Sequence, residues 1–231
     1  MQLTFDWSRR TGSSRNDFLI SDSNAAALSW IDRWPDWPSR VLALHGPAGC
    51  GKTHLLDLWC DQTSGLAVRG QMLSEDLLAV LACERGYRVA VDEADRAPER
   101  LLLHLQNLCL ESRGFLLLAA RRPPAAWSIG LPDLGSRLNA ALAVGIGSPD
   151  DTLLEAVLVK HFADRQLRVA PAVLAHLITH MERSFAAAAD ITARLDMASL
   201  RDRREITVPL ARRILSEAAA HPSSPSRDSG V

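Results

Sequence analysis

Short runs of consecutive apolar residues alternate with longer stretches of mixed polarity over the first two thirds of the chain. The apolar runs have the length of strands and cover residues 41–45, 66–68, 89–92, 115–120 and 142–146. The stretches between them suit helices and lie near residues 51–62, 73–84, 97–112 and 131–141. Strands that are apolar throughout and alternate with helices predict an α/β fold, with a five-stranded parallel sheet flanked by helices.

The pattern changes after Ser148, beyond which no segment has the pattern of a strand. Four stretches there have helical spacing, namely residues 150–165, 171–182, 185–200 and 208–220. We therefore expect an α/β domain over residues 16–148 and a small all-helical domain over residues 149–220. Residues 1–15 are interpreted as a flexible arm, and the Pro- and Ser-rich residues 221–231 as a disordered tail.

The composition is typical of a globular intracellular protein. The 231 residues are 47% hydrophobic, which is enough for a sizeable core, and a net charge of −1 gives no general attraction to nucleic acid. The four cysteines show neither CxxC nor metal-ligand spacing and are expected to be reduced. Because no signal peptide or membrane-spanning stretch is evident, a cytoplasmic location is expected.

A phosphate-binding loop follows the first strand. It matches GxxxxGK[ST] and consists of Gly46, Pro47, Ala48, Gly49, Cys50, Gly51, Lys52 and Thr53. Backbone N–H groups in such a loop, and the positive potential of the helix N-terminus behind it, bind an anion. Lys52 is expected to reach the β- and γ-phosphates of ADP or ATP, Thr53 to ligate Mg²⁺, and His54 to contribute to nucleotide binding. Lys52 and Lys160 are the only lysines among 26 basic residues, so lysine is kept where a compact charge suits phosphate.

Two acidic residues, Asp92 and Glu93, come at the end of the third apolar run, about forty residues after the loop. Asp92 is expected to hold Mg²⁺ through water, and Glu93 to polarise the attacking water. The alternative is an ordinary strand end with two solvated acids. The presence of a phosphate loop at this spacing favours the first interpretation.

Two arginines elsewhere are candidates for contact with a nucleotide. Arg137 lies in the helix before the fifth strand, the usual position of an arginine finger that acts on a neighbour's nucleotide. Arg183 is expected near the start of a helix in the second domain, placed to fold back on bound phosphates. For each, the alternative is an exposed surface arginine. The fourth strand ends in Ala119 and Ala120, which cannot sense a γ-phosphate, and Arg121 is explained equally well as a sensor or as a surface charge.

In this order, the motifs resemble those of the AAA+ ATPases, and within them the DnaA branch, over roughly residues 15–220. The resemblance is carried by GPAGCGKTHL, VDEAD, Ser136-Arg137-Leu138 and Arg183. It implies an AAA+ core with a helical lid, in which Phe18 and Leu19 pack on the adenine. From this sequence, no helix-turn-helix initiator domain is expected after the lid. In this the chain is similar to the Hda family, short DnaA relatives that help to switch off the initiator.

The first residues of the arm contain a short motif that favours the same family. Gln2, Leu3 and Phe5 are similar to the Q-L-x-[LF] motif by which bacterial proteins dock on the sliding clamp. An extended peptide of this kind places one polar anchor and alternating apolar side chains into a preformed groove. The resemblance therefore implies two partners, the DNA polymerase III β sliding clamp and DnaA, with DNA reached only through the clamp.

The resemblance implies a negative regulator of replication initiation, which stimulates hydrolysis of DnaA-bound ATP through Arg137. DnaA-like initiators usually have Ser-Asp-Arg where this chain has Ala119-Ala120-Arg121, so its own ATP hydrolysis is expected to be weak. They often have R-L-x-S-R where this chain has Asp133-Leu134-Gly135-Ser136-Arg137, which leaves Arg137 as the single finger. The alternatives are a stand-alone P-loop ATPase and a helicase-loader-like assembly factor. An exposed finger would also allow self-association into a homo-oligomer.

Overall fold

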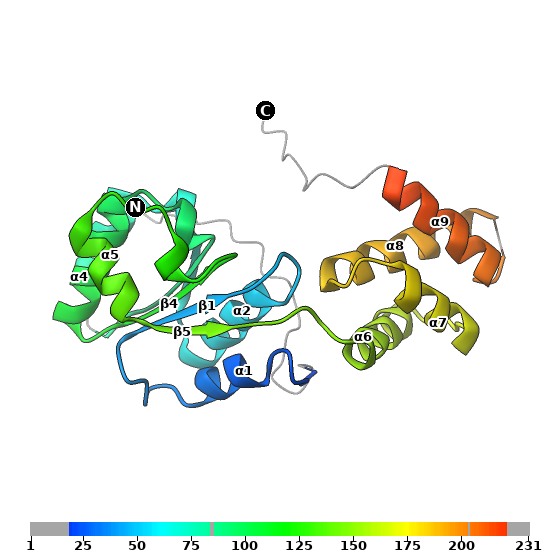
Figure 1. Ribbon diagram of the computed structural model, residues 1–231, viewed down its shortest axis with the longest axis horizontal. Coiled ribbons are helices and arrows are strands. Elements are labelled where there is room, and N and C mark those ends of the chain that lie inside the picture. The colour runs from blue at the N-terminus through cyan, green and yellow to red at the C-terminus, as the bar shows by residue number, and fades with distance from the viewer. Residues whose placement is uncertain (1–18, 84–85, 203, 221–231) are drawn as a thin grey trace. The chain divides into compact units, whose positions relative to one another are not determined.

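The computed structural model describes residues 19–83, 86–202 and 204–220. The chain divides into two compact units, one up to Ser148 and the other from Pro149 onward. Figure 1 shows the elements of both units. The candidate clamp-binding residues and Phe18 lie outside the described residues.

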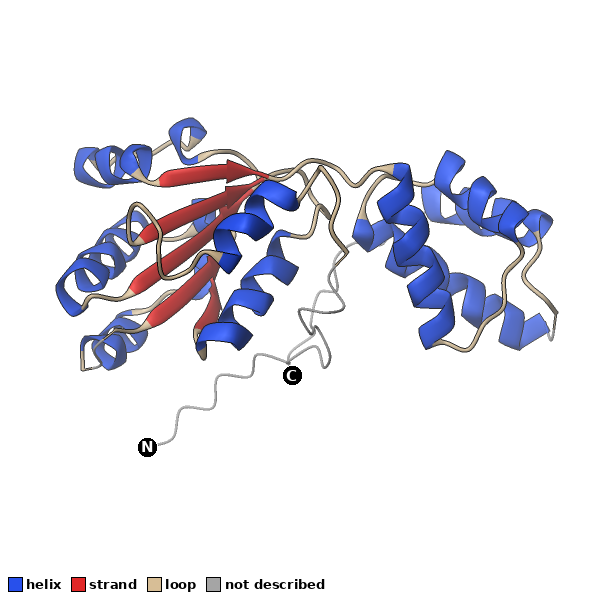
Figure 2. Ribbon diagram, turned by 90° about the horizontal axis from the view of Figure 1, so that it is seen from below, coloured by secondary structure: helices blue, strands red, loops and turns tan. Residues whose placement is uncertain are grey.

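The first unit contains a five-stranded parallel sheet with helices on both faces, which confirms the predicted fold class (Figure 2). The strands are β1 Val41–His45, β2 Leu66–Arg69, β3 Arg88–Asp92, β4 Phe115–Ala120 and β5 Leu142–Gly145. They lie in the order β2-β3-β4-β1-β5, and each neighbouring pair is parallel. The central strand β4 is buried from Leu116 to Ala120, which explains its unbroken apolar sequence.

Helices on the two faces bury two separate apolar clusters against the sheet. These helices are α1 Ala25–Asp32, α2 Lys52–Thr63, α3 Glu75–Ala82, α4 Glu99–Ser112 and α5 Pro132–Ala140. α1 and α2 contribute to one cluster, and α3, α4 and α5 to the other. Three 3₁₀ turns that the sequence pattern did not predict also occur, namely η2 Gly70–Met72, η3 Ala94–Arg96 and η4 Pro124–Ala126.

The sheet order places the carboxyl ends of three neighbouring strands, β3, β4 and β1, next to one another. His45 at the end of β1 pairs with Ala120 at the end of β4, and Val91 near the end of β3 pairs with Leu118. The segments that follow β1, β3 and β4 therefore emerge side by side. In open α/β sheets, ligands bind beyond the carboxyl ends of the strands.

The second unit is all-helical in the part of the chain that the structure describes. Its helices are α6 Asp151–Asp164, α7 Pro171–His180, α8 Phe185–Asp202 and α9 Val208–Ala220. All four contribute side chains to a single apolar core. The helix predicted over residues 185–200 begins at Phe185. The hydroxyl of Ser184 accepts a hydrogen bond from the N–H of Ala187 at 3.1 Å, so Arg183 precedes the helix.

Candidate nucleotide-binding site

The phosphate loop lies between β1 and α2 in a backbone conformation that its glycines make accessible. Gly49 has φ of +70° and Gly51, the N-cap of α2, has φ of +97°. Both angles lie in the region that side chains disfavour. Gly46 approaches the segment after β5 so closely that a Cβ atom on it would lie 2.3 Å from the carbonyl oxygen of Ile146. The first N–H groups of α2 have no intrahelical acceptor, and they give the loop its anion-binding character.

The ammonium group of Lys52 lies within this loop. Its Nζ donates to the carbonyl oxygens of Gly46 at 2.8 Å and Pro47 at 2.7 Å, and lies 3.6 Å from the sulfur of Cys50. These bonds hold a positive charge at the place where phosphate oxygens are expected. Burial, and then the charge of Lys52, lower the pKa of the neighbouring His45, which keeps this imidazole neutral at pH 7.

Thr53 and Asp92, the two residues predicted to hold Mg²⁺, contact each other beyond the carboxyl ends of the strands. The Thr53 hydroxyl donates to Asp92 Oδ2 at 2.6 Å, and Asp92 Oδ1 accepts the backbone N–H of Glu93 at 2.9 Å. A hydroxyl and a carboxylate are hard oxygen ligands of the kind that Mg²⁺ prefers, together with nucleotide phosphates and water. The pair fits the predicted metal. His54, in the first turn of α2, is half-buried.

Glu93 has an unusual backbone conformation for a non-glycine residue. Its φ of 50° and ψ of 44° lie in the left-handed region. Its carboxylate forms an ion pair with Arg96, with Oε2 lying 3.2 Å from Nη1. A Cβ atom on Gly70 would lie 2.4 Å from the carbonyl oxygen of Glu93, so the turn also abuts η2 closely. The candidate base is therefore held by its surroundings, and sequence reasoning missed Arg96 and Gly70 in this role.

The end of β4 offers no polar side chain to a nucleotide. Ala119 and Ala120 are buried, and the first charged side chains after the strand belong to Arg121 and Arg122, both exposed. Arg121 therefore stands at the correct end of β4 for a sensor. Its role stays a prediction.

Arg137 is exposed on α5, between the buried anchors Leu134 and Leu138. Within the described part of the chain, its guanidinium forms neither a hydrogen bond nor an ion pair. Burial of the two leucines fixes the face that α5 turns to the core and leaves Arg137 on the outer side. This is the exposure that a finger acting on another molecule requires.

The remaining candidates for nucleotide contact lie on two other segments. Leu19 is half-buried, and its carbonyl accepts a hydrogen bond from the side chain of Asn24 at 3.0 Å. Asn24, which is 2% exposed, also accepts the N–H of Ser21 and so ties this segment to the start of α1. In the second unit, the guanidinium of Arg183 lies 2.7 Å from the carboxylate of Asp151. The contacts predicted for Leu19 and Arg183 with nucleotide stay predictions.

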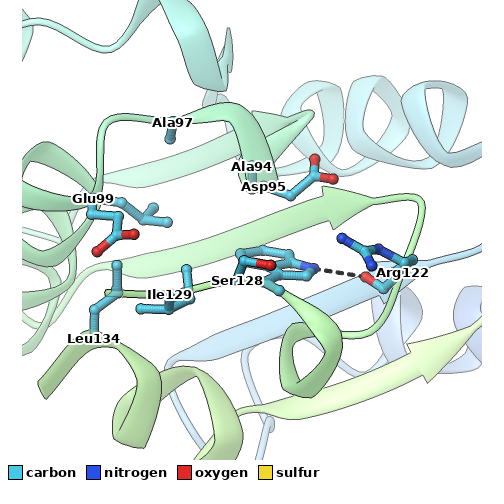
Figure 3. Close-up of a pocket in the computed structure, with 10 residues that line it drawn as sticks. Ala94, Asp95, Ala97, Glu99, Arg122, Ser128, Ile129 and Leu134 are labelled. Atoms are coloured by element: carbon cyan, nitrogen blue, oxygen red, sulfur yellow. Dashed lines mark hydrogen bonds between the residues drawn. The ribbon is translucent and has the colours of Figure 1, made fainter. Parts of the chain in front are cut away.

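A cavity of about 170 Å³ lies beside the carboxyl ends of the strands, between η3, the start of α4, η4 and the start of α5. Figure 3 shows Glu99 near one end of it and Asp95 and Arg122 near the other. The indole N–H of Trp127 donates to the carbonyl oxygen of Arg122 at 2.8 Å. The cavity does not include the phosphate loop. It adjoins the turn after Glu93 and the helix that carries Arg137.

Solved structures of DnaA and of RuvB share the fold. Domain III of the Thermotoga maritima replication initiation protein DnaA matches with a TM-score of 0.74 and 16% identity, over 89% of this chain and 96% of that one. The Thermotoga maritima RuvB Holliday junction branch migration motor matches with a TM-score of 0.71 and 18% identity, over 89% and 72%. DnaA bound to AMPPCP and single-stranded DNA matches with a TM-score of 0.65 and 13% identity, over 82% and 67%. The α/β unit and the helical second unit of this chain therefore share their fold with DnaA and RuvB.

Sequence comparison finds a matching family and a relative of similar length. Residues 150–215 match the family described as the lid domain of Hda. An uncharacterized protein of Haemophilus influenzae is 29% identical over 215 residues, which cover 87% of this chain and 90% of that protein. The second unit therefore matches the Hda lid family over residues 150–215, and the chain as a whole is similar in fold to DnaA. In the described residues, no helix has the length and apolar character needed to cross a membrane.

Proposed function

We propose that this protein is a nucleotide-bound adaptor that restrains initiation of DNA replication. In this proposal it docks on the DNA-loaded sliding clamp and inserts Arg137 into the active site of ATP-loaded DnaA, which then hydrolyses its ATP. The observation that carries the proposal is the exposed, unpartnered guanidinium of Arg137 on a DnaA-like core, among the described residues. The Hda lid match supports DnaA as the partner, and such partners would place the activity in the cytoplasm.

Binding of ADP or ATP with Mg²⁺ is proposed for the loop from Gly46 to Thr53. The loop conformation, the placement of Lys52 and the contact between Thr53 and Asp92 support it. A structural relative, DnaA, has been solved with AMPPCP bound. We further propose that Phe18 and Leu19 contact the base and that Arg183 contacts the phosphates, which would make the lid position depend on nucleotide.

The protein's own turnover is proposed to be slow. The carboxylate of Glu93 is engaged by Arg96, and the end of β4 has only buried alanines where a polar sensor is expected. Bound nucleotide would then serve to hold a conformation that presents Arg137. Steady-state hydrolysis by the isolated protein tests this directly: rapid turnover without DnaA would favour a stand-alone ATPase instead. The close contact between Thr53 and Asp92 is the observation that favours this second candidate.

The arm is proposed to recruit the clamp through Gln2, Leu3 and Phe5. A weak motif is sufficient because tethering raises the local concentration of a partner to about the millimolar range. The double variant Gln2→Ala with Leu3→Ala should bind nucleotide normally, yet lose both retention on clamp-loaded DNA and stimulation of DnaA. Normal clamp retention by this variant would refute the motif. A helicase-loader-like protein would instead form a stable complex with the helicase and would not require the arm.

A further inference from the structure

Glu99, the first residue of α4, bridges to the segment that leads into α5. Its Oε1 accepts the backbone N–H of Gly130 at 2.9 Å, and its Oε2 accepts the N–H groups of Gly130 at 3.1 Å and Leu131 at 2.8 Å. The bridge joins residues more than thirty positions apart in sequence. Both carboxylate oxygens are used, and hydrogen bonds to an ionised group are stronger than neutral ones. Figure 3 shows the Glu99 carboxylate near Ile129 and Leu134.

The Glu99 carboxylate supplies a hydrogen-bond acceptor that the side chains of α5 do not provide at the N-terminus of this helix. Leu131 is the N-cap of this helix, and no side-chain hydrogen bond caps it there. In a capping box the side chain at the third helical position accepts the N–H of the N-cap residue, but that position in α5 is Leu134, so the N–H of Leu131 takes its acceptor from elsewhere. The Glu99 carboxylate provides that acceptor and places negative charge at the positive end of the helix dipole.

Apolar packing and the bridge constrain different parts of α5. Leu134 and Leu138 are buried in the core and fix which face of the helix lies against it. A cavity of about 170 Å³ lies beside the N-terminal end, lined there by Leu102, Trp127, Ile129 and Leu134. At that end, the hydrogen bonds from Gly130 and Leu131 to Glu99 hold the backbone that leads into the helix.

We propose that Glu99 is a positioning residue for Arg137. A helix is stiff along its length, so fixing the N-cap residue Leu131 also fixes Arg137, six residues and about 9 Å further along α5. A displacement of about 1 Å in a group that acts in a reaction can lower the rate on the order of a hundredfold. This inference rests on the proposed function, in which Arg137 acts on DnaA-bound ATP.

The test measures hydrolysis of DnaA-bound ATP on clamp-loaded DNA, with the protein varied in concentration. Glu99→Ala should lower the maximal rate by about ten- to a hundredfold. The half-saturating concentration and the affinity for ADP should stay unchanged. The maximal rate with Glu99→Gln should lie between the rates with Glu99→Ala and with the wild type, because the amide of glutamine retains one acceptor oxygen. Glu111→Gln, an exposed change on the same helix, should match the wild type.

A double variant separates this inference from the proposed function. If Glu99 acts through Arg137, Glu99→Ala with Arg137→Ala should be no slower than Arg137→Ala alone. An unchanged maximal rate in Glu99→Ala, beside a strong loss in Arg137→Ala, would overturn the positioning role. Full stimulation by Arg137→Ala would instead overturn the finger itself.

Hydrogen exchange provides a readout that does not depend on DnaA. The amides of Gly130, Leu131 and the first turn of α5 should exchange faster in both Glu99 variants than in the wild type. Unchanged protection of these amides would overturn the positioning role, whatever the outcome of the hydrolysis assay. Because Glu99→Gln retains part of the bridge, it keeps the test usable if Glu99→Ala does not fold.

Discussion

Individual residues of the phosphate loop show which sequence features are required by geometry. Positive φ angles explain why Gly49 and Gly51 are glycines, and close contact with the backbone of Ile146 explains why Gly46 is one. These requirements could be predicted from the GxxxxGK[ST] pattern, since the pattern encodes them. The contacts of Glu93 with Arg96 and Gly70 could not be, because they depend on how η2 and η3 pack.

Two glycine-to-alanine substitutions should change the stability of the protein in opposite directions. Gly46→Ala places a methyl 2.3 Å from the Ile146 carbonyl oxygen, so it should abolish nucleotide binding and destabilise the protein by about 1–3 kcal/mol. Gly135→Ala, in α5, meets its nearest atom at 3.8 Å and should stabilise the protein by about 0.5–1 kcal/mol. Denaturant unfolding and ADP titration measure both effects. Wild-type ADP affinity in Gly46→Ala would contradict the close packing of the loop.

At the scale of elements, the sequence predicted each strand and the main helices, because strands buried on both faces leave an unmistakable run of apolar residues. The helix predicted over residues 185–200 spans Phe185–Asp202, and Ser184 caps its start. Arg183, which was expected near this start, lies just before the helix. The 3₁₀ turns have no apolar periodicity of their own and escaped prediction.

Helix α4 also contains a stability defect that substitution can remove. Gln106 is 2% exposed, and neither atom of its amide has a hydrogen-bond partner among the described residues. An unsatisfied buried polar group costs about 1–3 kcal/mol, so Gln106→Leu should raise the free energy of unfolding by a similar amount. Gln71→Leu, an exposed control, should change it little. A loss of stability in Gln106→Leu would show that the amide has a partner in solution.

At the scale of the whole molecule, the carboxyl edge of the sheet gathers the candidates that sequence motifs had named. Lys52, Thr53, Asp92 and Glu93 could be predicted together because strand ends of a parallel sheet share one edge. The link from Glu99 to Leu131 could not, because an acidic residue in the first turn of a helix is already explained by the helix dipole. Only the fold shows that this carboxylate serves another helix.

Stability of the molecule should fall on both sides of neutral pH. Burial is the largest cause that lowers the pKa of His45, His161 and His176 below 6.5, so in acid the unfolded chain binds protons that the folded state excludes. The free energy of unfolding should therefore decrease as the pH falls below 6.5. Denaturant titrations followed by circular dichroism measure it. A free energy of unfolding that stays constant as the pH falls from neutrality to below 6.5 would contradict these shifts.

The decrease in stability at alkaline pH is expected from two buried thiols. Burial raises the pKa of Cys60 and Cys109 from 9.0 to about 12. The unfolded chain loses these protons first, so the free energy of unfolding should decrease as the pH rises from 9.0 toward 12. Replacement of Cys109 by Ala should reduce this slope, and an unchanged slope would exclude that thiol as a cause.

The central claim is that Arg137 acts in trans on ATP bound to DnaA, and one measurement tests it most directly. DnaA loaded with labelled ATP is mixed with clamp-loaded DNA and with wild-type protein, Arg137→Ala or the matched control Asn139→Ala, an exposed position on the same helix. An arginine finger contributes on the order of 10³–10⁵ in rate. Arg137→Ala should therefore leave only the basal hydrolysis of DnaA, whereas Asn139→Ala should stimulate like the wild type. Wild-type stimulation by Arg137→Ala would contradict the account.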